Sequence, residues 1–242
     1  MRLTFLGTRG EIAARTALHR MHSCLMVNDR VLVDCGADWL GKLKTLHPHA
    51  IVLTHAHPDH AGGLKRGAPC RVYATAQTWN GLRRYPISDR EMIVPRWPLK
   101  IGDIEFEAFA VEHSLSAPAV GYRITADGVA VFYVPDLVSI HECHEALSGI
   151  QLYVGDGASI VRPILRHRAG VFIGHASVRD QLDWCRDEGV SQVIVTHCGS
   201  QIVKADARTV AARVRKLGQE RGIEVLIAHD GMKRTVRSTE HA

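Results

Sequence analysis

The chain has 242 residues, of which 46% are hydrophobic and 23% charged, and it carries a net charge of +5. This is the composition of a globular protein that can bury a large core, and no apolar run reaches the roughly 18 residues of a membrane span. The start does not resemble a signal peptide, so we expect no membrane partner and a cytoplasmic location. The basic balance favours anionic partners such as nucleic acid, nucleotides or phosphate esters.

Short apolar runs alternate with amphipathic stretches along the whole chain. We expect strands over 2–6, 24–27, 30–34, 51–54, 71–74, 104–111, 120–125, 129–134, 151–154, 171–173, 192–196, 224–228 and 233–236. We expect helices over 39–46, 60–65, 76–82, 139–147, 178–188 and 205–219. The pattern predicts one α/β domain over 1–236, with two sheets packed face to face and helices outside, and a frayed tail over 237–242.

The hexapeptide His55-Ala56-His57-Pro58-Asp59-His60 follows an apolar run and is the most informative segment of the chain. Three imidazoles and a carboxylate within six positions are typical of a metal-ligand cluster. A histidine-rich surface loop is the alternative, but such loops seldom follow a buried strand. His55 and His57 are expected to converge on one ion, whereas Asp59 and His60 begin a helix and face a second, adjacent position.

Four polar residues end later apolar runs in the same way: His113, Asp136, His175 and His197. A sheet delivers such residues to a shared edge, where functional side chains gather. Each of them alone is commonly an ordinary polar group. Together with the hexapeptide they are candidates for the remaining ligands of a two-metal site.

These segments resemble the metallo-β-lactamase-fold hydrolases over nearly the whole chain. Closest are the ribonuclease Z-like and cyclic phosphodiesterase branches. Further support comes from Phe5-Leu6-Gly7-Thr8, Leu32-Val33-Asp34-Cys35-Gly36 and Asp230-Gly231-Met232. The resemblance implies a four-layer αβ/βα sandwich.

The same resemblance implies roles for individual residues. One metal would be held by His55, His57 and His113, the other by Asp59, His60 and His197, with Asp136 bridging them. His175 matches a histidine that contacts the scissile phosphate or assists the leaving group, so Asp59 and His175 are the expected catalytic residues. Asp34 is expected behind the ligands, where a carboxylate orients an imidazole. His229, at another strand end, is expected to support the site in a similar way.

The ligand set indicates two divalent metal ions that share a bridging hydroxide, nucleophilic at neutral pH. Zinc is expected, while manganese or iron also suit nitrogen and oxygen ligands. The predicted activity is hydrolysis of a phosphodiester in nucleic acid or a nucleotide-like molecule; cleavage of a thioester or lactone is the alternative. The basic, loop-like segment with Arg162, Arg166 and Arg168 is the expected substrate contact.

Some family features have no counterpart in this sequence. Leu137 follows Asp136 where relatives usually have Thr or Ser, and no long Gly/Pro-rich arm is visible. Glu142 and Glu145 are only nearby candidates for the acidic partner of His175. These departures favour another phosphodiesterase over tRNA 3′ processing. A redox domain would need a fused module, the intact ligand set argues against a non-catalytic binder, and a homodimer is one expectation for the oligomeric state.

Overall fold

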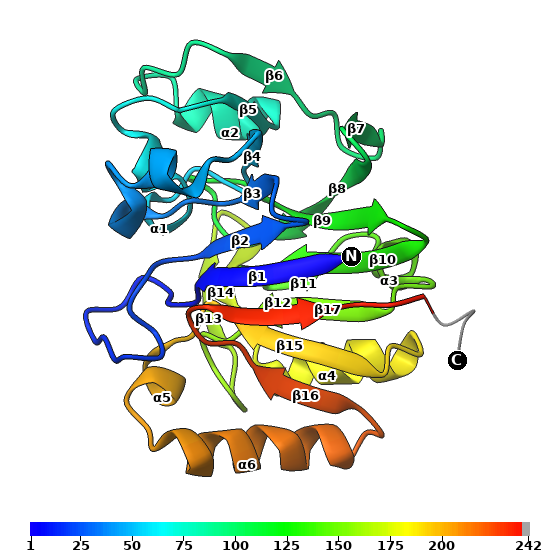
Figure 1. Cartoon of the computed structure of the whole chain (residues 1–242). Coiled ribbons are helices and arrows are strands. Elements are labelled where there is room, and N and C mark those ends of the chain that lie inside the picture. Colours follow the sequence, from blue (N-terminus) through cyan, green and yellow to red (C-terminus); the bar gives the residue numbers. More distant parts are fainter. Residues whose placement is uncertain (239–242) are drawn as a thin grey trace.

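Two mixed sheets dominate the structure, a computed structural model that describes residues 1–238 (Figure 1). The predicted tail lies outside the described residues from position 239 onward. The first sheet has the strand order β17 (Met232–Thr235), β1 (Arg2–Gly7), β2 (Cys24–Val27), β3 (Val31–Val33), β4 (Ala50–Val52), β5 (Arg71–Ala74) and β6 (Arg90–Met92). The second has the order β11 (Ser139–Ile140), β8 (Ile104–Glu112), β9 (Ala119–Ala126), β10 (Val129–Val134), β12 (Leu152–Asp156), β15 (Gln192–Thr196) and β16 (Glu224–Ile227). Strand β7 (Leu99–Ile101) pairs with β8 at the side of the second sheet.

Six short or medium α-helices flank these sheets in the described part of the chain. They are α1 (Pro58–Ala61), α2 (Ala76–Gly81), α3 (Cys143–Leu147), α4 (Val178–Asp187), α5 (Ser200–Val203) and α6 (Ala207–Gln219). None of the helices in residues 1–238 is long and apolar enough to cross a membrane.

Three separate hydrophobic cores define the layers. Phe5 of the first sheet and Phe106 of the second belong to the core between the sheets. On the outer side of the first sheet, Ile51 belongs to a core with Trp79 of α2. On the outer side of the second, Tyr153 packs in a core with helical residues of α4 and α6. Helix, sheet, sheet and helix therefore stack in four layers, which confirms the predicted αβ/βα sandwich.

The centre of the second sheet follows directly from its sequence. Strand β10 is buried at every position, as expected for a strand that is covered on both faces. It pairs antiparallel with β9 through a turn at Asp127 and Gly128, whose φ angles of 53° and 69° suit a two-residue hairpin. Strands β10, β12, β15 and β16 then run parallel, so their carboxyl ends lie along one edge.

Several elements differ from the predicted ones. The expected helix over 39–46 consists of two 3₁₀ turns, η1 (Ala37–Trp39) and η2 (Leu43–Leu46), and the expected helix over 139–147 is β11 followed by α3. The expected loop over 162–168 contains β13 (Ile164–Arg168), which forms a separate hairpin with β14 (Val171–His175). Every residue of β13 is exposed, so no burial pattern marks it as a strand. The six cysteines are free thiols, as the sequence predicts.

Candidate metal centre

Neighbouring strand ends bring the later candidate residues together. Asp136 follows β10, Asp156 ends β12, and His197 follows β15, and these three parallel strands are adjacent in the second sheet. His113 follows β8, and His175 is the last residue of β14. The edge formed by the carboxyl ends of the strands therefore holds four polar side chains, and the separate β13–β14 hairpin adds His175. These residues face the hexapeptide that follows β4 of the first sheet.

The hexapeptide divides into an extended half and a helical half. His55 and His57 lie on the loop after β4, and Pro58 occupies the first turn of α1, where its missing N–H is tolerated. Asp59 lies in the same turn, close to the positive end of the helix. Asp59 and His60 are both buried, so the helix presents them to the interior.

The first candidate metal site consists of His55, His57, His113 and Asp136. His57 Nδ1 lies 3.0 Å from His55 Nε2 and 3.1 Å from His113 Nε2. Asp136 Oδ2 lies 3.3 Å from His55 Nε2 and 3.5 Å from His113 Nε2. One potential ligand atom from each of the four residues thus points to a common centre.

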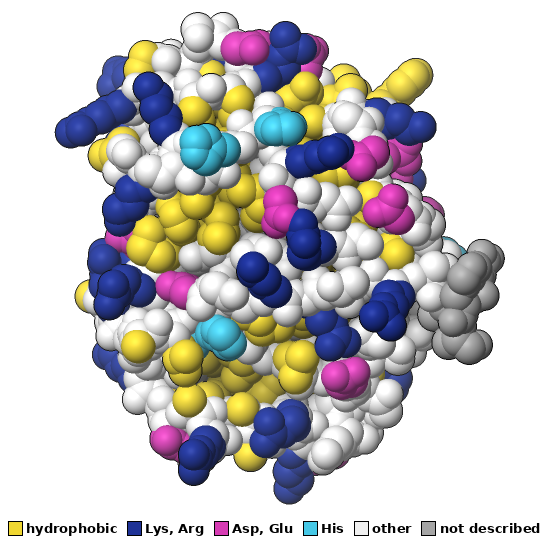
Figure 2. All heavy atoms as spheres, viewed as in Figure 1, with side chains coloured by type: hydrophobic (Ala, Val, Ile, Leu, Met, Phe, Trp, Pro, Cys, Tyr) yellow, Lys and Arg dark blue, Asp and Glu magenta, His cyan; other side chains and the backbone are white. Residues whose placement is uncertain are grey.

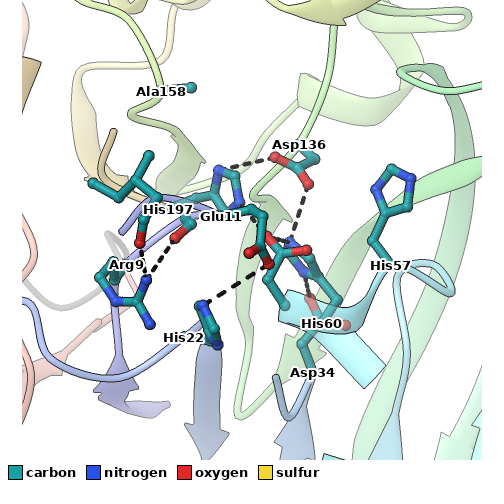
Figure 3. A network of polar contacts seen from close by, with 12 residues as sticks. Arg9, Glu11, His22, Asp34, His57, His60, Asp136, Ala158 and His197 are labelled. Carbon is teal, nitrogen blue, oxygen red and sulfur yellow. Dashed lines mark hydrogen bonds and ion pairs between the residues drawn. The ribbon is translucent and has the colours of Figure 1, made fainter. Parts of the chain in front are cut away.

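The second candidate site consists of Asp59, His60, Asp136 and His197. His60 Nε2 lies 3.0 Å from Asp136 Oδ2 and 3.4 Å from Asp59 Oδ2. His197 Nε2 lies 3.0 Å from Asp59 Oδ2, and its Nδ1 lies 2.9 Å from Asp136 Oδ1. Figure 3 shows Asp136 between His60 and His197. Asp136 is common to both candidate sites.

These contacts fit cations better than they fit a closed hydrogen-bond network. His60 Nε2, Asp136 Oδ1 and His197 Nδ1 are buried and lie close to oppositely charged groups, but none of them forms a contact with hydrogen-bond geometry. Buried polar atoms in this state are costly unless something else binds them. Ligands at zinc–nitrogen distances around a tetrahedral ion are separated by about 3.3 Å. The ligand-to-ligand separations of 3.0–3.5 Å around the first site bracket that value. The donor set therefore fits divalent cations.

In the metal-free protein the charges of Asp136 and of His55 and His57 suit cation binding. The carboxylates around His60 and His197 instead outweigh burial and raise the pKa of both rings, which would have to lose a proton to bind a metal. Burial favours neutral carboxyls, but the imidazolium groups nearby, His197 foremost, hold the pKa of Asp136 well below its usual range. Burial together with the charge of His60 lowers the pKa of His55, and burial together with His113 lowers the pKa of His57 to about 4. Ionised carboxylates and neutral imidazoles are the forms in which these side chains bind metals.

His175 forms a pair with a residue that the sequence analysis missed. Its Nδ1 donates to Asp156 Oδ2 at 2.8 Å and lies 3.4 Å from Asp136 Oδ1. Burial opposes a charge on the ring, but Asp156 and then Asp136 outweigh it and raise the pKa of His175 to about 10. The ring is therefore an imidazolium at neutral pH in the metal-free protein, and its partner is Asp156. Glu142 instead forms an ion pair with Arg96.

Asp34 lies behind the second candidate site. Its Oδ2 accepts a hydrogen bond from His60 Nδ1 at 2.8 Å, which leaves His60 Nε2 facing Asp136. The backbone N–H and hydroxyl of Thr54 donate to the same carboxylate. Asp34 has a φ of 60° and His197 a φ of 48°, uncommon backbone conformations for residues other than glycine. Such strained positions often occur at functional sites.

A buried arginine holds the loop at the mouth of the site. Arg9 is 1% exposed, forms an ion pair with Asp38, and donates to the backbone carbonyl of Ile12 (Figure 3). The neighbouring Gly10 lies against the ring of His197, since a Cβ there would approach His197 Cε1 to 2.9 Å. The sequence analysis did not identify Arg9, although a buried charge in an N-terminal loop is rare without a specific partner.

The two candidate cation sites open into a pocket of about 610 Å³. Its lining includes His175 and five of the seven candidate ligands, all except His55 and His60. The rest of the lining includes Glu11 and Ile12 from the N-terminal loop, Ile164 from β13, and Ser200 and Gln201 from α5. Of the hairpin residues before His175, Ile164 lines the pocket. Arg162, Arg166 and Arg168 do not line it.

His229, expected to support the ligands, lies elsewhere as well. It is exposed, its Nδ1 contacts the carbonyl oxygen of Asp230, and it lines a different pocket. The neighbouring Asp230 faces the N-terminal loop, where it accepts hydrogen bonds from Thr8 and from the backbone of Arg20 and Met21. Residues 228–230 thus support the N-terminal loop. The prediction that His229 supports the candidate ligands is wrong.

Comparison with known proteins agrees with this architecture. A family model described as a beta-lactamase superfamily domain matches residues 29–198, more than half of the chain. Ribonuclease Z from Methanopyrus kandleri is 27% identical over 287 aligned residues, and the match covers 97% of this chain and 98% of the relative.

Solved structures of other proteins share the fold. A diphosphatase of the PhnP family superposes with a TM-score of 0.70 at 20% identity, covering 98% of both chains. The short form of human tRNase Z superposes with a TM-score of 0.65 at 15% identity, covering 98% of this chain and 100% of that one. The matched family model, the four-layer sandwich and the paired histidine–aspartate clusters lead to one conclusion: the chain belongs to the beta-lactamase superfamily and is a metal-dependent hydrolase.

Proposed function

We propose that the protein is a dinuclear phosphodiesterase that cleaves nucleic acid or a nucleotide-like phosphodiester. His55, His57 and His113 would hold one cation, Asp59, His60 and His197 the other, and Asp136 would bridge them. Zinc suits these nitrogen and oxygen donors best. When bound, two divalent cations lower the pKa of a water molecule and neutralise charge on a phosphoryl group.

The observation that carries the phosphodiester assignment is the pair formed by His175 and Asp156. Any hydrolase of this fold needs cation sites, but not every leaving group needs a proton. The alkoxide released from a phosphodiester is strongly basic and is helped by a proton donor. A thiolate is much less basic, because a thiol has a pKa near 8.5. The imidazolium of His175, held at 2.8 Å by Asp156, therefore favours a phosphodiester over a thioester. A lactone also releases an alkoxide, but it is neutral, whereas the net charge of +5 favours an anionic substrate.

In this proposal the chain's own residues divide the work. His175 donates its proton to the leaving oxygen, and Asp156 stabilises the charge that the ring carries before the transfer. Asp34 keeps His60 in the tautomer that presents Nε2 to the cation. Arg9 fixes the N-terminal loop, so Glu11 and Ile12 keep their places at the pocket mouth.

The geometry of the β13–β14 hairpin favours a substrate that carries more than one phosphate. Its register pairs Ile164 with His175, Arg166 with Ile173, and Arg168 with Val171. Because side chains alternate along a strand, Arg166 and Arg168 share the face that carries Ile164 and His175. At roughly 3.3 Å per residue, Arg168 lies about 13 Å along the strand from Ile164. We propose that this face follows the substrate backbone outward from the pocket, with Arg162 at the base of the hairpin.

The names of two relatives are consistent with a phosphate-bearing substrate. One is a ribonuclease and another a diphosphatase. The cytoplasmic location, the single-domain organisation over 1–236 and a homodimer remain predictions.

The test measures metal content and the hydrolysis of bis(p-nitrophenyl) phosphate, a thioester and a lactone in parallel. We expect turnover of the phosphodiester that is abolished by His57→Ala and by Asp136→Ala. His144→Ala is the matched control, because this histidine is exposed and pairs only with Glu188 among the described ion pairs. Rapid cleavage of the thioester or the lactone beside an inert phosphodiester would replace this proposal with the alternative activity.

A further inference from the structure

A second pocket lies on the opposite side of α5 from the candidate metal centre. It has a volume of about 410 Å³, and its walls come from the 16–19 loop, α5, the inner face of α6, and β16 with the residues after it. It shares no lining residue with the pocket at the metal centre. Figure 2 shows a hollow lined by hydrophobic side chains above α6, with a histidine and several basic side chains around it.

Apolar side chains form most of this pocket. Ile202 and Val203 from α5, Val210 from α6, and Val225 and Ile227 from β16 line it. A concave, mostly apolar site with a few polar groups is the usual form of a small-molecule pocket, and the volume lies within the ordinary range of about 300–1,000 Å³.

The polar side chains of the pocket are basic apart from Thr16. Arg215, His19 and His229 line it, and none of its lining residues is Asp or Glu. Arg215 forms none of the ion pairs or hydrogen bonds found in the described part of the chain. An unpaired guanidinium beside an apolar cavity suits a carboxylate or sulfonate, which it binds through paired hydrogen bonds.

We propose that this pocket binds a small organic anion with an apolar body, such as a medium-chain carboxylate. The acid group would contact Arg215, and the apolar body would lie against Ile202, Val210 and Ile227. A neutral apolar molecule would gain nothing from Arg215, which is exposed beside the pocket, and an apolar cation would be repelled by it. The site is separate from the proposed phosphodiester chemistry and does not depend on it.

The test uses the fluorescent anion 8-anilinonaphthalene-1-sulfonate with the folded full-length chain. We expect saturable binding of one molecule per chain. Ala211→Trp fills the pocket and should abolish binding, whereas Ala212→Trp, the adjacent residue outside the pocket on the same helix, should bind like the wild type. Arg215→Glu should weaken binding by about tenfold or more, the effect of losing a charge-assisted contact. Arg213→Glu is its control.

Competition separates the charge from the apolar body. Decanoate should displace the fluorescent probe, and decyltrimethylammonium, with the same chain length and opposite charge, should not. Circular dichroism of each variant establishes that it is folded. Equal binding by the Ala211→Trp and Ala212→Trp variants, or equal displacement by the two decyl compounds, would overturn the proposal. Absence of any saturable binding to the wild type would overturn it as well.

Discussion

Replacing Asp156 with asparagine tests the pair that distinguishes this site. The pKa of His175 is about 10 against an ordinary value of 6.5. Once the opposing cost of burial is subtracted, this difference of 3.5 corresponds to a net stabilisation of the charged ring by roughly 5 kcal/mol. This stabilisation comes from two carboxylates: Asp156, whose Oδ2 lies 2.8 Å from His175 Nδ1, and Asp136, whose Oδ1 lies 3.4 Å from it. Because an opposite charge within about 4–6 Å shifts a pKa by about 1–3 units, Asp156→Asn should lower the pKa of His175 by that amount.

The assay is an NMR titration of the His175 ring in metal-free protein, with Glu188→Gln as the control. Glu188 contacts His144 at 2.7 Å on the surface, so its loss should shift His144 and leave His175 unchanged. The raised pKa also fixes the sign of the effect on stability. The His175 contribution is complete below pH 6.5 and disappears as the pH rises through about 10. In urea unfolding, the difference in free energy of unfolding between wild type and Asp156→Asn should therefore be larger below pH 6.5 than above pH 10. An unchanged His175 titration in Asp156→Asn would refute the reasoning.

Three further predictions concern the metal ligands, the hairpin and the leaving group. Asp34→Ala removes the partner of His60 Nδ1 and should weaken metal affinity by about 10–100-fold, measured by chelator competition, and unchanged affinity would contradict the role given to Asp34. Arg166→Glu should raise KM for a short oligonucleotide several-fold and leave bis(p-nitrophenyl) phosphate unaffected, while Arg213→Glu on α6 should change neither; an equal effect on both substrates would argue against the hairpin path. His175→Ala should lower kcat by about 10²–10⁴-fold for an alkyl phosphodiester. For an aryl phosphodiester, whose leaving group needs no proton, kcat should fall only slightly. Equal losses of kcat for the two substrates would exclude proton donation by His175.

The sequence predicted most of the site because one physical rule placed it. Polar residues that end buried strands meet at a common edge, so His113, Asp136 and His197 could be selected without coordinates. His175 was selected by the same pattern, although its strand β14 is only partly buried and belongs to the separate hairpin. Asp156 obeys the same rule, since it ends the fully buried β12. The sequence did not indicate Asp156 as the partner of His175, because the two residues belong to different strands and only the fold brings them together. Glu142 and Glu145, the candidates named from the sequence, lie elsewhere along the chain.

Other features had no local signal. Strand β13 is exposed at every position, and β6 likewise, so neither shows the alternation that marks a half-buried strand. Their positions depend on partners distant in the sequence. His229 follows a strand as the candidate ligands do, but β16 is the last strand of its sheet, and the segment after it turns toward the N-terminal loop. The rule selects an edge of the sheet and does not tell which positions along that edge lie at the site.

The most direct test of the account is a crystal structure of the zinc-loaded protein, with anomalous scattering recorded at the zinc edge. The account predicts two peaks within one pocket, one bound by His55, His57 and His113 and one by Asp59, His60 and His197, with Asp136 contacting both. A single peak, or ions bound away from Asp136, would contradict the two-metal site on which the proposed chemistry depends.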